Sequence, residues 1–417
     1  MDLSSTEHDQ LSGHQGPAVQ LAMELVMQAA RILKAPHLVA ITYAHIDACF
    51  YNGQAHIDFA QFMLTHGAKF PVPAWTNNGV VSATHPELYD GNPDTGMVEG
   101  ARQLMQLYAQ LGCKPTWTCA PYQIPGGPKF GEHIVVGESN AVTYYNSAVG
   151  ARTNKYGDYL DVACALIGKA PFAGLHTDEG RAAALCFDVA QLPESWRSEN
   201  IFHHLLGHHV GRIAGRRVPA VSGLLPTTTS DDLKAFSTAV ASSGGVELWH
   251  GVGVTPEAPS LDAVFRSQEK HAVCREDLIT AQAQLTSSRD GPLDMVALGT
   301  PHFSATEFRA VAEALDGRKV QIPVTITTSR FVWDYAISKG WGDTLKRAGV
   351  TIIGDICSYY APGINGMKGR VMTNAAKWAY YAPGMLPVEV CFGSLKECVE
   401  SAVRGEVWRD PNLWETS

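Results

Sequence analysis

The stretch VQIPVTITTSRFVWDYAISKGWGDTLKRAGVTIIGDIC (residues 320–357) decides the fold class. Residues 320–329 and 350–357 are short apolar runs rich in β-branched side chains, which predicts a strand in each. Between them, residues 331–349 carry apolar side chains at helical spacing and predict a helix. Two strands separated by a helix of this length indicate an α/β unit with parallel strands.

The same alternation recurs along much of the chain. Helices are predicted over residues 17–34, 56–70, 96–112 and 306–317, and strands over 37–46, 70–75 and 115–122. We therefore expect an α/β protein with parallel sheets flanked by helices. Its first residues, 1–16, are polar and predict a flexible leader, followed by a catalytic region over 17–417 with subdomains of about 17–190, 191–290 and 291–417.

Composition describes a folded globular protein. Of 417 residues, 45% are hydrophobic and 18% charged, with a formal net charge of −9. Lys and Arg are scattered, so no nucleic-acid partner is expected, and no apolar run is long enough to cross a membrane. The nine cysteines follow no secretion signal, which predicts a reducing, cytoplasmic location and thiols rather than disulfides.

Residues that can carry chemistry follow the apolar strands. They are His45, Asp47, Cys119, Ser329, Arg330, Asp355 and Cys357. Ligands of open parallel sheets bind beyond the carboxyl ends of the strands. We therefore expect these segments to converge on one site, although they span more than 300 residues of sequence.

Residues 118–154 are unusually dense in Gly, Asn, Ser and Thr, and also contain Glu138, Arg152 and Asn154. Polar groups gathered in an otherwise apolar region destabilise it unless each is hydrogen-bonded. Taken singly, each residue fits a turn or a helix cap. For the segment as a whole, a ligand site is the better interpretation.

Two cysteines, Cys119 and Cys357, stand at strand ends beside Pro, Gly or Asp. A pair of thiolates at one site suits iron–sulfur or zinc binding, although free cysteine is commonly a small core residue. The other seven cysteines lie in or beside apolar stretches and are assigned to packing. His204 and His208 have the i, i+4 spacing of a metal pair, but no third ligand accompanies them, so we interpret them as ordinary helical histidines.

Two further segments end a strand and open a helix. In MTNAAKWAYYAPG (372–384), Thr373 or Asn374 can cap the helix, and its N-terminus with Lys377 can also bind a carboxylate. In ITTSR (326–330), Ser329 can cap while Arg330 holds a carboxylate through two hydrogen bonds. No nucleotide-binding or serine-hydrolase motif is present.

At this point the chain resembles the aconitase X family, in the same order from about residue 17 to 405. The matching stretches include YAHIDACFYNG (43–53), GNPDTGMVEGA (91–101), residues 118–154, GLHTDEGRAA (174–183), GHHVGRIAGRRVPAVSGL (207–224), LGTPHFSATEF (298–308), TTSR (327–330), GDICSYYAPG (354–363), MTNAAKWAYYAPG (372–384) and FGSLKECVESAVRG (392–405). The resemblance implies an aconitase-like fold of several subdomains, an iron–sulfur cluster, and dehydration of a hydroxy acid.

The family also implies a partner. Known members resemble cis-3-hydroxy-L-proline dehydratases or mevalonate 5-phosphate dehydratases, and their large part works with a small swivelling domain. Because this sequence ends where the large part ends, we expect the small domain to be a separate subunit or to be absent. In related enzymes a serine on that domain resembles the catalytic base.

By the resemblance, the cluster cysteines fall on Cys119, Cys357 and the position of Thr300. A hydroxyl is a poor iron ligand beside thiolates, so the expectation is a smaller cluster such as [2Fe–2S], a mononuclear iron, or another metal held with His302. A second departure is Gly180, where the family usually has Asn.

The expected site residues form two groups. Candidates for proton transfer or polar positioning are His45, Asp47, Glu138 and Ser139. Candidates for substrate binding are Asn92, Asn146, Arg152, Thr153, Asn154, His176, Ser329, Arg330, Thr373, Asn374 and Lys377. The expected reaction is loss of water from a small hydroxy acid with Lewis-acid help from the metal.

The substrate expected from these residues is a hydroxyproline-like amino acid, because a phosphorylated substrate calls for more clustered Lys and Arg than the sequence shows. Three alternatives remain: a mevalonate 5-phosphate dehydratase, a metal-dependent isomerase or hydratase without a cluster, and a non-catalytic subunit that lost a ligand at Thr300.

Overall fold

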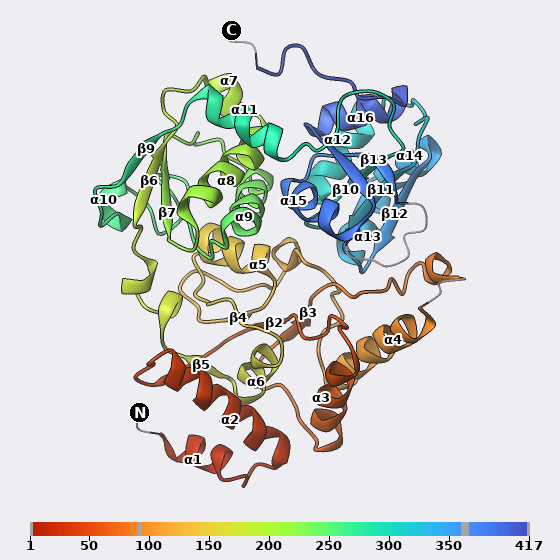
Figure 1. Ribbon diagram of the computed structural model, residues 1–417. Helices are drawn as coiled ribbons and strands as arrows, with labels where there is room; N and C mark the ends of the chain where they lie inside the picture. The colour runs from red at the N-terminus through yellow and green to blue at the C-terminus, as the bar shows by residue number, and fades with distance from the viewer. Residues whose placement is uncertain (1–2, 91–93, 360–366, 415–417) are drawn as a thin grey trace.

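The computed structural model describes residues 3–90, 94–359 and 367–414. Three regions succeed one another along the chain, each built around its own parallel sheet (Figure 1). In Figure 1 the N-terminal region lies below, with the middle region at the upper left and the C-terminal region at the upper right. The prediction of parallel sheets flanked by helices is confirmed.

The N-terminal region holds a three-stranded parallel sheet of order β3-β2-β4 and an antiparallel pair, β1-β5. Its elements are α1 (Ser5–Leu11), α2 (Pro17–Ile32), β1 (Leu38–Ala40), β2 (Ala44–Ile46), α3 (Gln54–Thr65), β3 (Ala74–Thr76), α4 (Thr95–Gln110), β4 (Val135–Val136), α5 (Ser139–Tyr144), α6 (Leu160–Ile167) and β5 (Lys169–Pro171). Helix α2 buries an apolar face that includes Ala22, Met23 and Val26.

Two expectations for this region differ from the structure. The segment expected to be a flexible leader contains α1, which Ser4 and Glu7 cap reciprocally and which Lys169 holds through an ion pair with Glu7. The single strand expected over 37–46 is divided into β1 and β2, because the two halves pair with different sheets.

The middle region is a four-stranded parallel sheet of order β8-β7-β6-β9. Its elements are β6 (Leu185–Asp188), α7 (Glu194–Arg197), α8 (Asn200–Ala214), β7 (Pro219–Ser222), α9 (Ser230–Gly244), β8 (His250–Gly251), α10 (Leu261–Val264), β9 (Lys270–Ala272) and α11 (Arg275–Gln284). Helices α8 and α9 approach closely at Gly207, where a Cβ atom would lie 2.7 Å from the Phe236 carbonyl oxygen.

The C-terminal region is a five-stranded parallel sheet of order β12-β11-β10-β13-β14. Its elements are β10 (Met295–Leu298), α12 (Ala305–Leu315), β11 (Val324–Thr328), α13 (Arg330–Ser338), α14 (Trp341–Ala348), β12 (Val350–Gly354), β13 (Gly369–Thr373), α15 (Ala376–Met385), β14 (Val388–Phe392) and α16 (Leu395–Arg404). The one helix expected over 331–349 is two helices, because Gly340 adopts a left-handed conformation with φ of 78°.

Short turns of 3-10 or π helix complete the described elements: η1 (Pro86–Tyr89), η2 (Pro121–Gln123), η3 (Tyr145–Val149), η4 (Gly174–His176) and η5 (Glu179–Arg181). The strand expected over 115–122 is absent from the structure, and this segment is an irregular loop followed by η2. Among the described residues, no helix combines the length and apolar character that crossing a membrane requires.

The N-terminal and C-terminal sheets meet at their carboxyl edges. The backbone N–H of Gly79, which follows β3, donates to the carbonyl oxygen of Asp355, which follows β12, at 2.7 Å. Because the ends of parallel strands in both sheets face this junction, side chains from both sheets can share one cavity there.

Candidate active site

A cavity of about 170 Å³ lies at this junction. The residues that line it are Asp47, Phe50, Asn77, Asn78, Cys119, Glu138, Asp158, Cys357, Tyr359 and Lys377. Three of them, Asp47, Asn77 and Glu138, directly follow β2 and β3 or come two residues after β4. The expected convergence of strand-end residues on one site is therefore seen for part of the predicted set.

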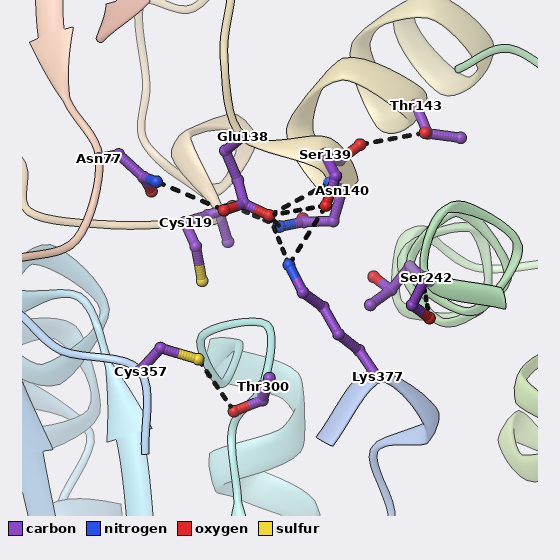
Figure 2. A network of polar contacts seen from close by, with 12 residues as sticks. Asn77, Cys119, Glu138, Ser139, Asn140, Thr143, Ser242, Thr300, Cys357 and Lys377 are labelled. Atoms are coloured by element: carbon purple, nitrogen blue, oxygen red, sulfur yellow. Dashed lines mark hydrogen bonds and ion pairs between the residues drawn. The ribbon is translucent and has the colours of Figure 1, made fainter. Parts of the chain in front are cut away.

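Cys119 and Cys357 both line this cavity, although they lie 238 residues apart in the sequence. Each is nearly fully buried, and Figure 2 shows both sulfur atoms in the region beside Glu138. Burial raises the pKa of both thiols, that of Cys357 to about 11. Thr300 lies beside Cys357, as expected, with its hydroxyl oxygen 3.3 Å from the Cys357 sulfur.

His302 is not placed as a third ligand. Its Nε2–H donates to the carbonyl oxygen of Ile356 at 2.8 Å, and its Nδ1 accepts from the hydroxyl of Thr118 at 2.9 Å. Both ring nitrogens are thus occupied by neighbours of the two cysteines, and the backbone N–H of His302 lies 3.3 Å from the Cys119 sulfur. The expectation that His302 binds metal does not fit this geometry.

The donor set at the cavity fits a soft metal centre held by two thiolates. Among residues 3–90, 94–359 and 367–414, no group of three or more His, Cys, Asp or Glu side chains is arranged to hold a metal ion. A cluster held by three cysteines therefore does not fit these residues. Ligation by the pair would displace the two thiol protons.

Lys377 and Glu138 form a nearly buried ion pair, with Nζ 2.5 Å from Oε1. Lys377 lies in the first turn of α15, and Glu138 caps the N-terminus of α5 (Figure 2). Glu138 also accepts hydrogen bonds from the backbone and side-chain N–H groups of Asn140, at 3.2 and 2.8 Å. Burial alone would raise the pKa of Glu138, but Lys377 and these donors hold it well below its ordinary value.

Asp47 is the carboxylate on the other side of this network. Its side chain accepts a hydrogen bond from Asn77, and its backbone N–H donates to Asp161 at 2.6 Å. Burial, together with the nearby charges of Glu138 and Asp158, raises the pKa of Asp47 to about 7. Both protonation states of Asp47 are therefore accessible near neutral pH.

The other two residues expected to act in proton transfer have different placements. His45 is fully buried and is not among the residues that line the cavity. Its Nε2–H donates to the Thr118 carbonyl oxygen at 2.9 Å, and burial lowers its pKa to about 4. Ser139 donates to Glu138 at 3.2 Å and accepts weakly from Lys377 at 3.4 Å. Ser139 thus positions the ion pair.

Five residues expected to bind substrate belong to a separate polar network and do not line this cavity: Asn146, Arg152, Thr153, Asn154 and His176. Their polar groups bond to the protein itself. Arg152 pairs with Asp178 at 2.5 Å and donates to the His176 carbonyl oxygen at 3.2 Å. Asn146 accepts from both the Thr153 backbone and Arg181, at 3.0 Å each.

Arg330 holds a carboxylate through two hydrogen bonds as expected, but the carboxylate is that of Asp355, at 2.7 Å for both bonds. Ser329 caps α13 by accepting from the backbone N–H of Val332. Thr373 likewise accepts from the backbone N–H of Ala375 at 3.2 Å. These residues therefore stabilise the strand–helix turns, and none of them lines the cavity.

Asn374 is buried, and its side-chain oxygen has no hydrogen-bond partner among the described residues. Asn92, also expected to bind substrate, lies outside the described residues. The histidines His204 and His208 are buried in α8, and His208 bonds to Gln284 at 3.0 Å, in agreement with their interpretation as structural.

The prediction omitted several residues of the cavity: Phe50, Asn77, Asn78, Asp158 and Tyr359. The pair Asn77–Asn78 directly follows β3, so the same strand-end argument that selected Asp47 could have found it. No comparable signal marks Asp158 or Tyr359 in the sequence.

Comparison with known proteins gives consistent matches over nearly the whole chain. Family models described as the first, second and third domains of aconitase X match residues 1–179, 183–283 and 293–404. A cis-3-hydroxy-L-proline dehydratase of Hypocrea jecorina is 39% identical, over 97% of this chain and 69% of that protein. One of Pseudomonas aeruginosa is 38% identical, over 95% and 69%.

Two matches come from Thermococcus. A phosphomevalonate dehydratase large subunit of Thermococcus kodakarensis is 34% identical, over 91% of this chain and 95% of that protein. The holo-form crystal structure of Thermococcus kodakaraensis aconitase X superposes with a TM-score of 0.85 at 32% identity, covering 96% of this chain and 100% of that one.

Proposed function

Because this chain belongs to the aconitase X family, whose named relatives are dehydratases, we propose that it is a hydro-lyase that removes water from cis-3-hydroxy-L-proline or a similar small hydroxy amino acid. The observation that carries this proposal is the cavity that Cys119, Cys357, Lys377 and Asp47 share. The relatives named for cis-3-hydroxy-L-proline are 38–39% identical to this chain, and the one from Thermococcus named for phosphomevalonate is 34% identical.

The size of the cavity supports a small substrate. At about 170 Å³ it can hold a compact ligand such as a five-membered ring bearing a carboxylate. In addition, Lys377 is the only Lys or Arg among the described residues that line the cavity, and Glu138 already pairs with it.

The reaction breaks the C–H bond next to the carboxylate and the C–O bond on the neighbouring carbon, forms a C=C bond between them, and releases water. Negative charge develops on the carboxylate as the proton leaves. Lys377 is positioned to bind that carboxylate with an N–H that Glu138 and Ser139 do not use. Glu138 and Ser139 fix the Lys377 ammonium in place, so it is oriented before the charge forms.

We assign the metal centre to Cys119 and Cys357, as an iron–sulfur cluster such as [2Fe–2S] or a single iron. When bound, such a centre would supply Lewis-acid assistance to departure of the hydroxyl group. The two-thiolate set supports a centre that takes its remaining ligands from sulfide, water or substrate rather than from a third cysteine.

We also propose a small swivelling-domain subunit as partner, because relatives of this chain are named large subunits. A serine of that domain would take the proton, which leaves Asp47 for substrate positioning. The subdomain division near residues 190 and 290, and the cytoplasmic location, stay predictions.

The test is turnover of cis-3-hydroxy-L-proline by anaerobically purified protein, with and without a candidate small subunit of the same organism, followed by NMR of the product. We expect dehydration with the small subunit present, and iron with acid-labile sulfide in the protein. Turnover of mevalonate 5-phosphate alone would support the second candidate function. Absence of both turnover and binding, or a colourless zinc protein, would contradict the proposal.

A further inference from the structure

Asn77 lines the cavity, and one of its polar atoms has no partner in the described part of the protein. Its side-chain N–H groups donate to the carboxylates of Asp47 and Glu138, the latter at 3.3 Å. Because both partners are carboxylate oxygens, the amide has to present its nitrogen to them, which fixes the direction of its carbonyl oxygen. That oxygen, Oδ1, accepts no hydrogen bond from the described residues. Bulk solvent does not satisfy it either, because Asn77 is only 2% exposed.

A buried acceptor that makes no hydrogen bond destabilises the folded protein. The residues that line the cavity contribute no further donor to Asn77 Oδ1 in the described structure. A ligand that carries an N–H or O–H group to this position would therefore gain a hydrogen bond that the protein leaves unmade.

The charges around Asp47 are also unbalanced. Glu138 has Lys377 as its counter-charge, and Asp158 has His56 as a neighbour at 3.2 Å. Asp47 forms no ion pair with a cation among the described residues, and the nearby Lys377 is already paired with Glu138. Burial and the carboxylates of Glu138 and Asp158 raise the pKa of Asp47, and the weaker opposing effect of Lys377 does not offset them.

We propose that Asp47 and the Oδ1 atom of Asn77 form a subsite for the protonated ring nitrogen of a cyclic secondary amino acid, an inference that rests on the proposed function. Such a nitrogen carries two N–H groups and one positive charge, and the subsite offers one carboxylate and one free carbonyl oxygen. The carboxylate of the same ligand is directed to Lys377. A phosphate ester instead brings negative charge toward Asp47, Glu138 and Asp158, so this subsite selects against it.

The test compares two unreactive ligands of the same ring size, L-proline and cyclopentanecarboxylate, by anaerobic isothermal titration calorimetry at pH 8. Cyclopentanecarboxylate keeps the carboxylate but has carbon in place of nitrogen. We expect the wild-type chain to bind L-proline about tenfold tighter or more, as a charge-assisted hydrogen bond at a desolvated site provides. Equal binding of the two ligands, or no binding of either, would overturn the subsite.

Two variants localise the effect. Asp47→Asn keeps the size of the side chain but removes its charge. We expect this variant to bind L-proline and cyclopentanecarboxylate with dissociation constants that differ by less than about threefold. Asp158→Asn is the matched control, because it removes the same charge from a residue whose side chain is 38% exposed and faces His56. Retention of the full preference by Asp47→Asn, or an equal loss in both variants, would contradict the assignment.

The subsite and the proposed function can fail separately. Turnover of cis-3-hydroxy-L-proline without a preference for L-proline over cyclopentanecarboxylate would leave the function standing and overturn the subsite. The opposite result, a strong preference that Asp47→Asn abolishes but no turnover with any small subunit, would support the subsite and overturn the function.

Discussion

The ion pair between Lys377 and Glu138 makes a quantitative prediction. In Lys377→Gln, Glu138 loses its counter-charge at a site where the two side chains are 6% and 13% exposed. Removal of one partner from a buried pair costs about 3–5 kcal/mol. Glu138 keeps the N–H donors of Asn140 and Asn77, so we expect the lower end, about 3 kcal/mol.

This cost corresponds to a measurable thermal shift. With about 2.1 cal/mol/K of unfolding entropy per residue, 417 residues that unfold together give roughly 0.9 kcal/mol/K, so Tm should fall by about 3–4 °C. Circular dichroism melts at pH 7.5 measure it. The control is Lys396→Gln, which removes an ion pair with Asp410 from a side chain that is 64% exposed, and whose Tm should change by less than about 1 °C.

A double variant isolates the charge effect. Lys377→Gln combined with Glu138→Gln leaves no uncompensated charge at the site, so its Tm should recover by more than half of the loss. A Lys377→Gln shift no larger than that of Lys396→Gln would refute the buried ion pair. The same conclusion would follow if the double variant melted below Lys377→Gln.

Three further predictions concern the cavity and its surroundings. Arg330→Gln removes the partner of the fully buried Asp355, so it should lower Tm. The KM for cis-3-hydroxy-L-proline should change by less than about twofold, and a large rise in KM would indicate that Arg330 binds substrate after all. Thr300→Cys places a third thiol beside Cys357, so iron and sulfide retained after anaerobic reconstitution should exceed the wild-type content, and an unchanged content would argue against Thr300 at the metal centre. The pKa of Asp47 is raised from 3.8 to about 7, so between these pH values the folded chain keeps a proton that the unfolded chain releases. The free energy of unfolding should therefore fall as pH rises from about 4 to about 7, and Asp47→Asn should reduce this pH dependence in urea melts. An unaltered pH dependence would show that Asp47 titrates normally.

The parallel sheets could be predicted because their strands are short, apolar and separated by helices. Residues 320–357 show this directly, since β11 and β12 lie where the sequence places them. The two-residue strand β4 could not be found, because it lies inside the polar segment 118–154 and owes its existence to pairing with β2. It nevertheless carries Glu138 to the edge of the sheet.

The candidate site was predictable only in part, for a related reason. Strand-end position brings Asp47 and Cys357 to one cavity, because the carboxyl ends of parallel strands share one edge. Cys119 lines the same cavity from an irregular loop, since the strand expected before it is not formed. Whether a polar side chain faces a cavity or another side chain depends on tertiary contacts. The sequence around Arg330 is the same whether it holds a ligand or Asp355, and only the structure shows that it holds Asp355.

The polar segment illustrates the same limit. Glu138 and Asn146 lie eight residues apart, yet Glu138 lines the cavity while Asn146 bonds to Arg181 and the Thr153 backbone. Arg181 is a distant residue whose role no local pattern reveals. Density of polar residues predicted a network correctly, but it could not divide that network between ligand and protein.

The most direct measurement is a crystal structure of the anaerobically purified protein soaked with L-proline. We expect metal density bonded to the sulfur atoms of Cys119 and Cys357, and L-proline in the same cavity with its nitrogen at Asp47 and Asn77. Bare sulfur atoms, with L-proline bound instead beside Arg152 or elsewhere on the protein, would contradict this expectation.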